Sequence, residues 1–210
     1  MRKRQVFVSR IALALLLASL LFVALFFIAY GFSYWAFQNL SHQTNSLRTS
    51  VNELDVILSD FKCDDDLLIE SSELFDSAAD RLTLLENRFG KRDSRVLEQK
   101  IIYSELEALH FDIVKRFNKE CNGSYITVLF FYSNSNGKLE AMSEAMGFVL
   151  TTFEHQNSDK IMVYSFDRDL DSTVVSSLIE NYKITEIPSV VVNEGEPFTP
   201  KRFVDMLSYL

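Results

Sequence analysis

The sequence predicts an α/β protein in three parts: an N-terminal transmembrane helix, an α-helical hairpin that serves as a stalk, and a C-terminal domain whose central β-sheet has helices on both faces. Three observations predict these parts. Residues 11–38 contain no charged side chain, and residues 44–119 contain one glycine and no proline. Residues 124–210 alternate between strand-like and helix-like patterns.

The N-terminal segment predicts a signal anchor in the cell membrane. Residues 11–38 exceed the roughly 20 helical residues that cross a hydrocarbon core of about 30 Å. Four cations precede this run within residues 1–10, and the next cation is Arg48. We therefore expect residues 1–10 to be cytoplasmic and the C-terminal domain of this single-pass protein to be extracytoplasmic. A cleaved signal peptide remains the alternative, although its apolar region is usually shorter.

The charge of the chain bears on its partners. The net charge is −8, and removing the four N-terminal cations leaves −12 for the remainder. An acidic domain disfavours a nucleic-acid partner, because phosphate backbones attract basic surfaces. We also expect no cofactor and no metal. Asp167, Asp169 and Asp171 begin like a calcium loop, but Ser172 and Leu178 stand where that loop requires glycine and glutamate, so a turn is expected.

Two amphipathic helices are predicted after the apolar segment. Apolar residues recur at helical spacing over residues 64–89 and again over residues 94–120. Gly90 is expected to end the first of these helices, and Asp93 or Ser94 is expected to cap the second. The two segments are nearly equal in length, which predicts an antiparallel hairpin.

Cys63 and Cys121 are the two cysteines of the chain, and they flank this hairpin within the stalk, residues 42–121. Helices of equal length that fold back on each other bring both cysteines to the same end. The favoured prediction is a structural disulfide, which persists outside the cytoplasm. Two free buried thiols and a redox pair are the alternatives.

The C-terminal segment reads as a small sheet with interleaved helices. Uninterrupted apolar runs predict strands that are covered on both faces. The expected strands are 126–133, 160–166 and 187–193, and the expected helices are 138–155, 172–182 and a last helix that begins near Thr199 and Pro200.

The order of these elements, and the run from Asn181 to Pro188 (NYKITEIP), resemble the thioredoxin-like family. That family commonly places Tyr-Gly-Val and a cis proline before a strand, with the proline facing a Cys-x-x-Cys pair. Tyr182 and Ile184 match the lead-in, whereas Lys183 replaces the glycine. The resemblance covers residues 124–210 and implies that Ile187 and Pro188 flank a cis bond beside a peptide-binding surface.

The same resemblance places the family's cysteine pair at Asn136 and Leu139. Dithiol exchange requires a thiolate and a second thiol that resolves the mixed disulfide. An amide and an aliphatic side chain supply neither, so the active site is degenerate and we expect no catalytic residue. Asn136 is instead suited to cap the following helix.

We therefore expect a membrane-tethered, redox-inactive binding or scaffold module with a protein or polypeptide partner in the envelope. The predicted contact residues are Asn134, Ser135, Asn136, Ile187 and Pro188, because an extended peptide can add to such a surface without a thiol. The alternatives are an envelope thiol–disulfide enzyme that uses Cys63 and Cys121, and a structural subunit of a larger complex. Asn122, in Asn-Gly-Ser, is a possible glycosylation site.

Overall fold

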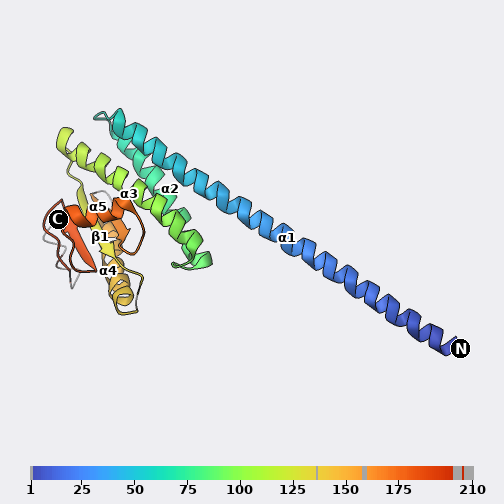
Figure 1. The fold of residues 1–210 in the computed structure, drawn as a ribbon. Coiled ribbons are helices and arrows are strands. Elements are labelled where there is room, and N and C mark those ends of the chain that lie inside the picture. The colour runs from blue at the N-terminus through green and yellow to red at the C-terminus, as the bar shows by residue number, and fades with distance from the viewer. Residues whose placement is uncertain (1, 136, 158–159, 201–204, 206–210) are drawn as a thin grey trace. The chain divides into compact units, whose positions relative to one another are not determined.

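The computed structural model describes residues 2–135, 137–157, 160–200 and 205, and it describes no side chains for residues 2–14 and 32–44. Helices make up 67% of the chain, and the described residues form one three-stranded sheet (Figure 1). The predicted α/β class is therefore wrong: the chain is mostly helical, because long helices precede a small sheet. The elements in chain order are α1 (Arg2–Ser59), α2 (Asp65–Phe89), α3 (Ser94–Glu120), β1 (Ile126–Tyr132), α4 (Gly137–Gln156), β2 (Ile161–Asp167), α5 (Thr173–Asn181) and β3 (Ser189–Val192).

The predicted transmembrane helix over residues 11–38 is also wrong. Among the residues that the structure describes, no helix combines the length and the apolar character that crossing a membrane demands. α1 instead continues without a break into a polar sequence that ends at Ser59.

The chain divides into two compact units, residues 1–45 and residues 46–210. The first unit consists of the N-terminal part of α1, and its described large side chains are exposed. The second unit contains the last turns of α1, the α2–α3 hairpin and the sheet. Leu47 and Leu54 of α1 are buried in the same hydrophobic core as the hairpin, so this end of α1 belongs to the folded unit.

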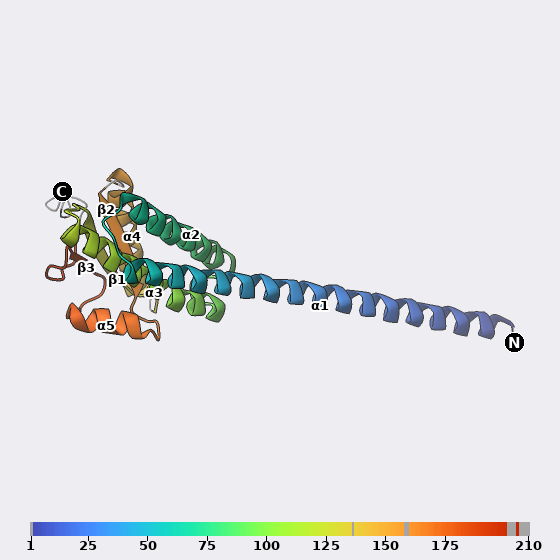
Figure 2. The same ribbon diagram turned by 90° about the horizontal axis from the view of Figure 1, so that it is seen from above.

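The hairpin helices begin and end where the sequence predicts. The Asp64 side chain caps α2 by accepting from the Asp66 amide at 3.1 Å, and the Asp93 side chain caps α3 by accepting from the Arg95 amide at 3.0 Å. Gly90 follows α2 with φ 89°, a left-handed conformation that suits glycine. α2 and α3 then lie side by side in both ribbon views (Figures 1 and 2).

The sheet has the strand order β2-β1-β3, with β1 parallel to β2 and antiparallel to β3. β1 is the central strand, and six of its seven residues are buried. Because neighbouring side chains of a strand point to opposite faces, β1 contributes to two cores. One core lies against the hairpin and α5, and the other lies against α4.

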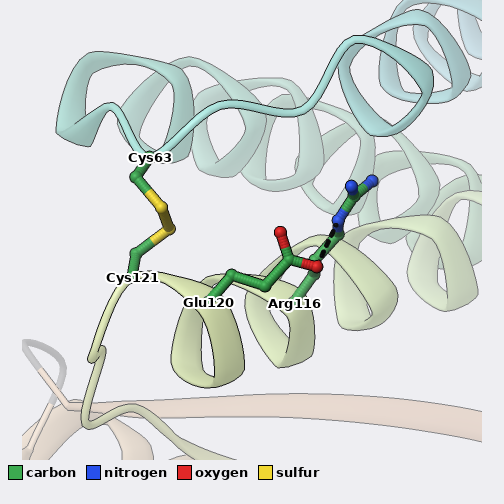
Figure 3. The surroundings of a disulfide bond; sticks show 4 residues. All are labelled: Cys63, Arg116, Glu120 and Cys121. Atoms are coloured by element: carbon green, nitrogen blue, oxygen red, sulfur yellow. Dashed lines mark hydrogen bonds and ion pairs between the residues drawn. A yellow bond between two sulfur atoms is a disulfide. The ribbon is translucent and has the colours of Figure 1, made fainter.

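The predicted disulfide between Cys63 and Cys121 is confirmed (Figure 3). The two Cα atoms are 5.3 Å apart, and the bond joins the α1–α2 loop to the residue that ends α3. It closes a loop with a sequence separation of 58 residues. In the chain-entropy model, a loop of this length stabilises the fold by about 4 kcal/mol.

Candidate functional site

The topology of the sheet brings several predicted site residues to one end. The parallel strands β1 and β2 finish at the same end of the sheet, and the antiparallel strand β3 begins at that end. The pairing of Phe131 with Ser189 places the residues after β1 next to Pro188. We call this region the strand-end site; it comprises Ser133, Asn134, Ser135, Asp167, Asp169, Ile187 and Pro188.

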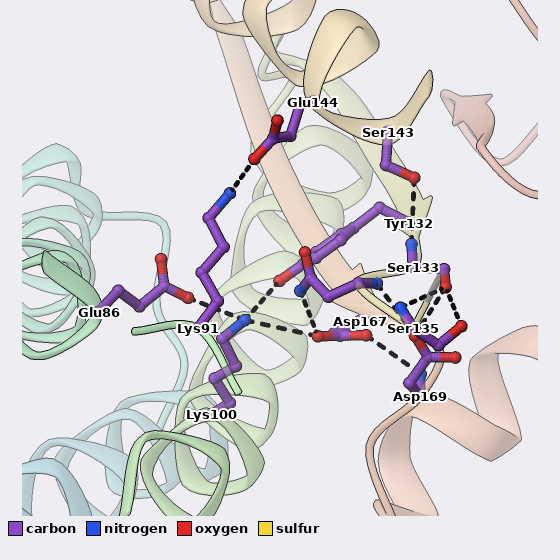
Figure 4. Close-up of polar contacts among 11 residues, drawn as sticks. Glu86, Lys91, Lys100, Tyr132, Ser133, Ser135, Ser143, Glu144, Asp167 and Asp169 are labelled. Carbon is purple, nitrogen blue, oxygen red and sulfur yellow. Dashed lines mark hydrogen bonds and ion pairs between the residues drawn. The ribbon is translucent and has the colours of Figure 1, made fainter. Parts of the chain in front are cut away.

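Asp169 holds the loop that follows β1 (Figure 4). Its Oδ2 accepts a hydrogen bond from the Ser133 hydroxyl at 2.7 Å and another from the Asn134 backbone amide at 3.0 Å. The Ser133 and Ser135 hydroxyls are 2.9 Å apart. The loop is therefore fixed by a carboxylate from the turn after β2, the turn that the aspartate spacing predicted.

A buried ion-pair network lies beneath this loop (Figure 4). Asp167 Oδ2 accepts from the Asn134 side chain at 2.7 Å and lies 3.4 Å from Lys100 Nζ. Lys100 Nζ also lies 2.8 Å from Glu86 Oε1. The side chains of Lys100 and Asp167 are 4% and 2% exposed, so each charge is compensated by its neighbours rather than by water. Burial also raises the pKa of Tyr132, whose hydroxyl is 3.4 Å from Lys100 Nζ.

Of the predicted contact residues, Asn134 and Pro188 are buried, Ser135 is exposed and Ile187 is half-buried. Ser133, which precedes them, is also buried. The Ile187–Pro188 peptide bond is cis, the isomer that the sequence resemblance implied. Of the two positions that match the family's cysteines, Leu139 is half-buried in α4, and Asn136 lies outside the described residues. Ser135 and Ile187 are thus the described contact candidates that reach the surface.

The disulfide lies at the opposite end of β1 from the strand-end site. Cys121 precedes β1, whereas Ser133 follows it, and the seven residues of β1 span roughly 20 Å at about 3.3 Å per residue. Thiols at Cys63 and Cys121 are therefore too far from Pro188 to replace a Cys-x-x-Cys pair beside it. Within the described part of the chain, no cluster of histidine, cysteine and carboxylate side chains is arranged to hold a metal ion. Asn122 is exposed in the loop before β1.

Sequence reasoning missed the polar residues that α3 buries. Lys100, Glu107 and His110 are each at most 4% exposed, and α3 buries residues on two sides because it lies between the other helices and the sheet. Their spacing was a usable signal. Val96, Lys100, Glu107, Val114 and Phe117 recur three to seven residues apart, which places two charged residues within an apolar helical stripe.

Comparisons with known proteins add little to this geometry. No family model matches the chain, and no curated protein matches it. Among solved structures, the chain is similar to oxidised thioredoxin O2 from Arabidopsis thaliana, with 18% identity and a TM-score of 0.35. That match covers 49% of this chain and 84% of the thioredoxin. A thioredoxin-like fold neighbour is thus found, and a similarity at this level supports no inference about activity.

Proposed function

We propose that this chain is a binding module that holds an extended polypeptide without exchanging disulfides. The observation that supports this proposal most directly is the loop after β1, where Asp169 holds Ser133 and Asn134 and no thiol is present. A nucleophilic exchange needs a thiolate at the reacting position. The described residues of the strand-end site that reach the surface, Ser135 and Ile187, offer a hydroxyl group and an apolar side chain, which can contact a polypeptide but do not accept electrons.

The proposed contact involves the segment before β3. Ile187 is half-buried and offers an apolar surface, and Ser135 is exposed on the neighbouring loop. An extended peptide gains affinity from main-chain hydrogen bonds and specificity from side-chain contacts. The rigid loop beside it limits the conformational entropy that is lost on binding.

The disulfide supports an oxidising compartment as the place where the module acts. Disulfides persist outside the cytoplasm and are rare in reducing compartments. The Cys63–Cys121 bond joins two segments of the hairpin and thereby holds the helices that cover the sheet. We therefore place the partner polypeptide in an extracytoplasmic compartment.

Binding to a labelled unfolded polypeptide tests the proposal on the full chain. Ile187→Lys introduces a charge into the proposed contact and is expected to weaken binding by roughly tenfold, the loss of one well-placed apolar anchor. Ile69→Lys is the matched control, because Ile69 is 57% exposed on α2. Fluorescence anisotropy measures both variants. Equal affinities of Ile187→Lys and wild type would show that the strand-end site does not bind the polypeptide.

One observation favours the alternative, a thiol–disulfide protein that uses Cys63 and Cys121. Cys63 is exposed and Cys121 is half-buried, and exposed disulfides are more readily attacked by thiolates. Mass spectrometry after equilibration in glutathione buffers separates the two functions. If the Cys63–Cys121 bond stays oxidised at the glutathione redox potential of a secretory compartment, a structural role is favoured. Rapid reduction and reoxidation of the bond would favour catalysis.

A further inference from the structure

The outer edge of β2 is a second surface with unusual hydrogen bonding. β2 pairs only with β1 in the described sheet, so its other side is an edge. The Ile126 amide donates to the Lys160 carbonyl, and the Arg168 amide donates to the Tyr132 carbonyl. The even-numbered residues of β2 and its flanks therefore direct their backbone amide and carbonyl groups toward β1. The backbone amides of Val163 and Ser165 therefore point away from β1.

Two carboxyl groups from opposite sides cap these outward amides. The Val163 amide donates to Glu154 Oε1 of α4 at 3.0 Å, and the Ser165 amide donates to Glu107 Oε1 of α3 at 2.7 Å. In a longer sheet, backbone carbonyls of a neighbouring strand would accept these bonds. Side-chain carboxyl groups thus occupy the positions that the carbonyls of an added strand would take.

Both caps lie in surroundings that disfavour their charge. Glu107 is 2% exposed, and burial raises its pKa well above the ordinary value, although the Ser165 amide and Lys100 oppose the shift. Burial also raises the pKa of Glu154, and it raises that of Asp76 on α2. Lys100 opposes the shift at Glu107 and His155 opposes it at Glu154, but both pKa values stay raised, and Lys100 is already paired with Glu86 and Asp167. A further cation would therefore find carboxyl groups whose charge is incompletely compensated.

A partly open cavity of about 700 Å³ lies beside this edge, within the volume range of ligand pockets. Its walls come from α2, α3, α4 and β2. The walls combine apolar side chains, such as Phe75 and Met162, with acidic ones. The acidic side chains are Asp76, Glu86, Glu107, Glu154 and Asp167, and they outnumber the basic ones, Lys100 and His155. Val163 and Ser165 are half-buried, so an incoming chain can reach the edge through the cavity. The acidic walls favour a cationic occupant, since opposite charges attract strongly in a partly desolvated site.

We propose that the β2 edge and this cavity bind an extended polypeptide segment that carries a lysine. Two carbonyls of the segment replace Glu107 and Glu154 as acceptors for the Ser165 and Val163 amides. The lysine ammonium pairs with the released carboxyl groups in their ionised form, and any proton they held passes to solvent. This inference rests on the proposed function only in that the partner is a polypeptide, because it uses a surface other than the strand-end site.

Binding of a short peptide to the full chain tests this inference. The probe is a labelled seven-residue peptide of alternating valine and threonine with a central lysine, and the matched peptide has norleucine in place of lysine. The lysine peptide is expected to bind roughly tenfold more tightly, and Glu107→Gln is expected to remove that preference. Glu98→Gln is the control, because Glu98 is an exposed residue of the same helix. If Glu107→Gln does not fold, Glu154→Gln serves the same purpose.

Hydrogen exchange shows whether the segment adds as a strand. Slower exchange of the Val163 and Ser165 amides is expected when the lysine peptide binds. Equal affinity for the two peptides would overturn the proposal. So would spermidine binding as tightly as the peptide, or peptide binding without added protection of these amides. If Ile187→Lys abolishes binding of the lysine peptide, the peptide binds at the strand-end site and the β2-edge proposal is wrong. If only Glu107→Gln removes the lysine preference, the β2-edge proposal holds, and the strand-end proposal is tested separately by the unfolded-polypeptide experiment.

Discussion

The two faces of the sheet are packed with different chemistry. On the α4 face, Val128 and Phe130 of β1 pack in one cluster with Leu150 and Phe153, and Ser143 is the one polar residue among those that α4 buries in the described structure. On the hairpin face, the core holds Phe131, Phe166 and Leu106 together with polar rings and charges. Tyr164 places its hydroxyl 2.9 Å from His110 Nδ1, and Glu107 and Lys100 are buried nearby on α3.

This difference suggests that the apolar packing contributes mainly to stability, whereas the buried charges are where binding of a ligand changes the energy most. Apolar packing stabilises a fold without a desolvation cost, whereas buried charges are stabilising only when neighbours compensate them. The α4 face thus resembles an ordinary core. The hairpin face carries Glu107, whose burial is unfavourable for its charged form in the free protein. A ligand at the β2 edge, which Glu154 of α4 also borders, can offset that cost.

The largest expected effect is the loss of an apolar contact on the α4 face. Phe153 is fully buried, and Phe153→Ala is expected to lower the free energy of unfolding by roughly 3–5 kcal/mol through lost burial and a residual cavity. Phe148→Ala is the control on the same helix, because Phe148 is 75% exposed and its removal should change stability by less than about 0.5 kcal/mol. Urea unfolding measures both. Equal losses would contradict an apolar core on this face.

The disulfide should account for much of the stability of the hairpin side. The double variant Cys63→Ser and Cys121→Ser is expected to lose about 4 kcal/mol, because the unfolded chain regains the entropy of a long loop. Hydrogen exchange should show the loss of protection first in α2 and α3. A double variant as stable as wild type would mean that the bond does not constrain this face.

Acid should weaken the hairpin face through His110. Burial lowers the pKa of His110 to about 4, whereas the unfolded side chain titrates near 6.5. The unfolded chain therefore binds a proton first, and the free energy of unfolding should fall by roughly 3 kcal/mol between about pH 6.5 and pH 4. His110→Gln should flatten this dependence. His155→Gln is the control for replacing a histidine, because His155 is exposed and its replacement should change stability by less than about 0.5 kcal/mol.

The contribution of Glu107 to the free energy of unfolding should change with pH in the direction opposite to that of His110. Its folded pKa is raised, chiefly by burial, so its stabilising contribution is complete below the unfolded pKa and is lost as the pH rises through the folded value. Glu107→Gln keeps an acceptor for the Ser165 amide and removes this titration. The variant should therefore gain stability relative to wild type as the pH rises. Stability differences that do not vary with pH would contradict the burial of an uncompensated carboxyl group.

Local signals in the sequence predicted local structure well. Gly90 and Asp93 marked the turn of the hairpin, and equal helix lengths predicted the Cys63–Cys121 bond. Contacts between residues distant in sequence leave no such local signal. Ser133 and Asn134 are held by Asp169, more than 30 residues away, which accepts their hydrogen bonds. An apolar run likewise does not by itself specify a membrane span, and residues 11–38 led to an error of that kind.

The central claim is that the module holds polypeptides but exchanges no electrons with them. The most direct measurement incubates the full chain with a labelled disulfide-containing polypeptide, and follows binding by anisotropy and disulfide exchange by non-reducing mass spectrometry in one sample. We expect binding with background exchange, unchanged in the double variant Cys63→Ser and Cys121→Ser. Exchange well above background that disappears in the double variant would contradict the account.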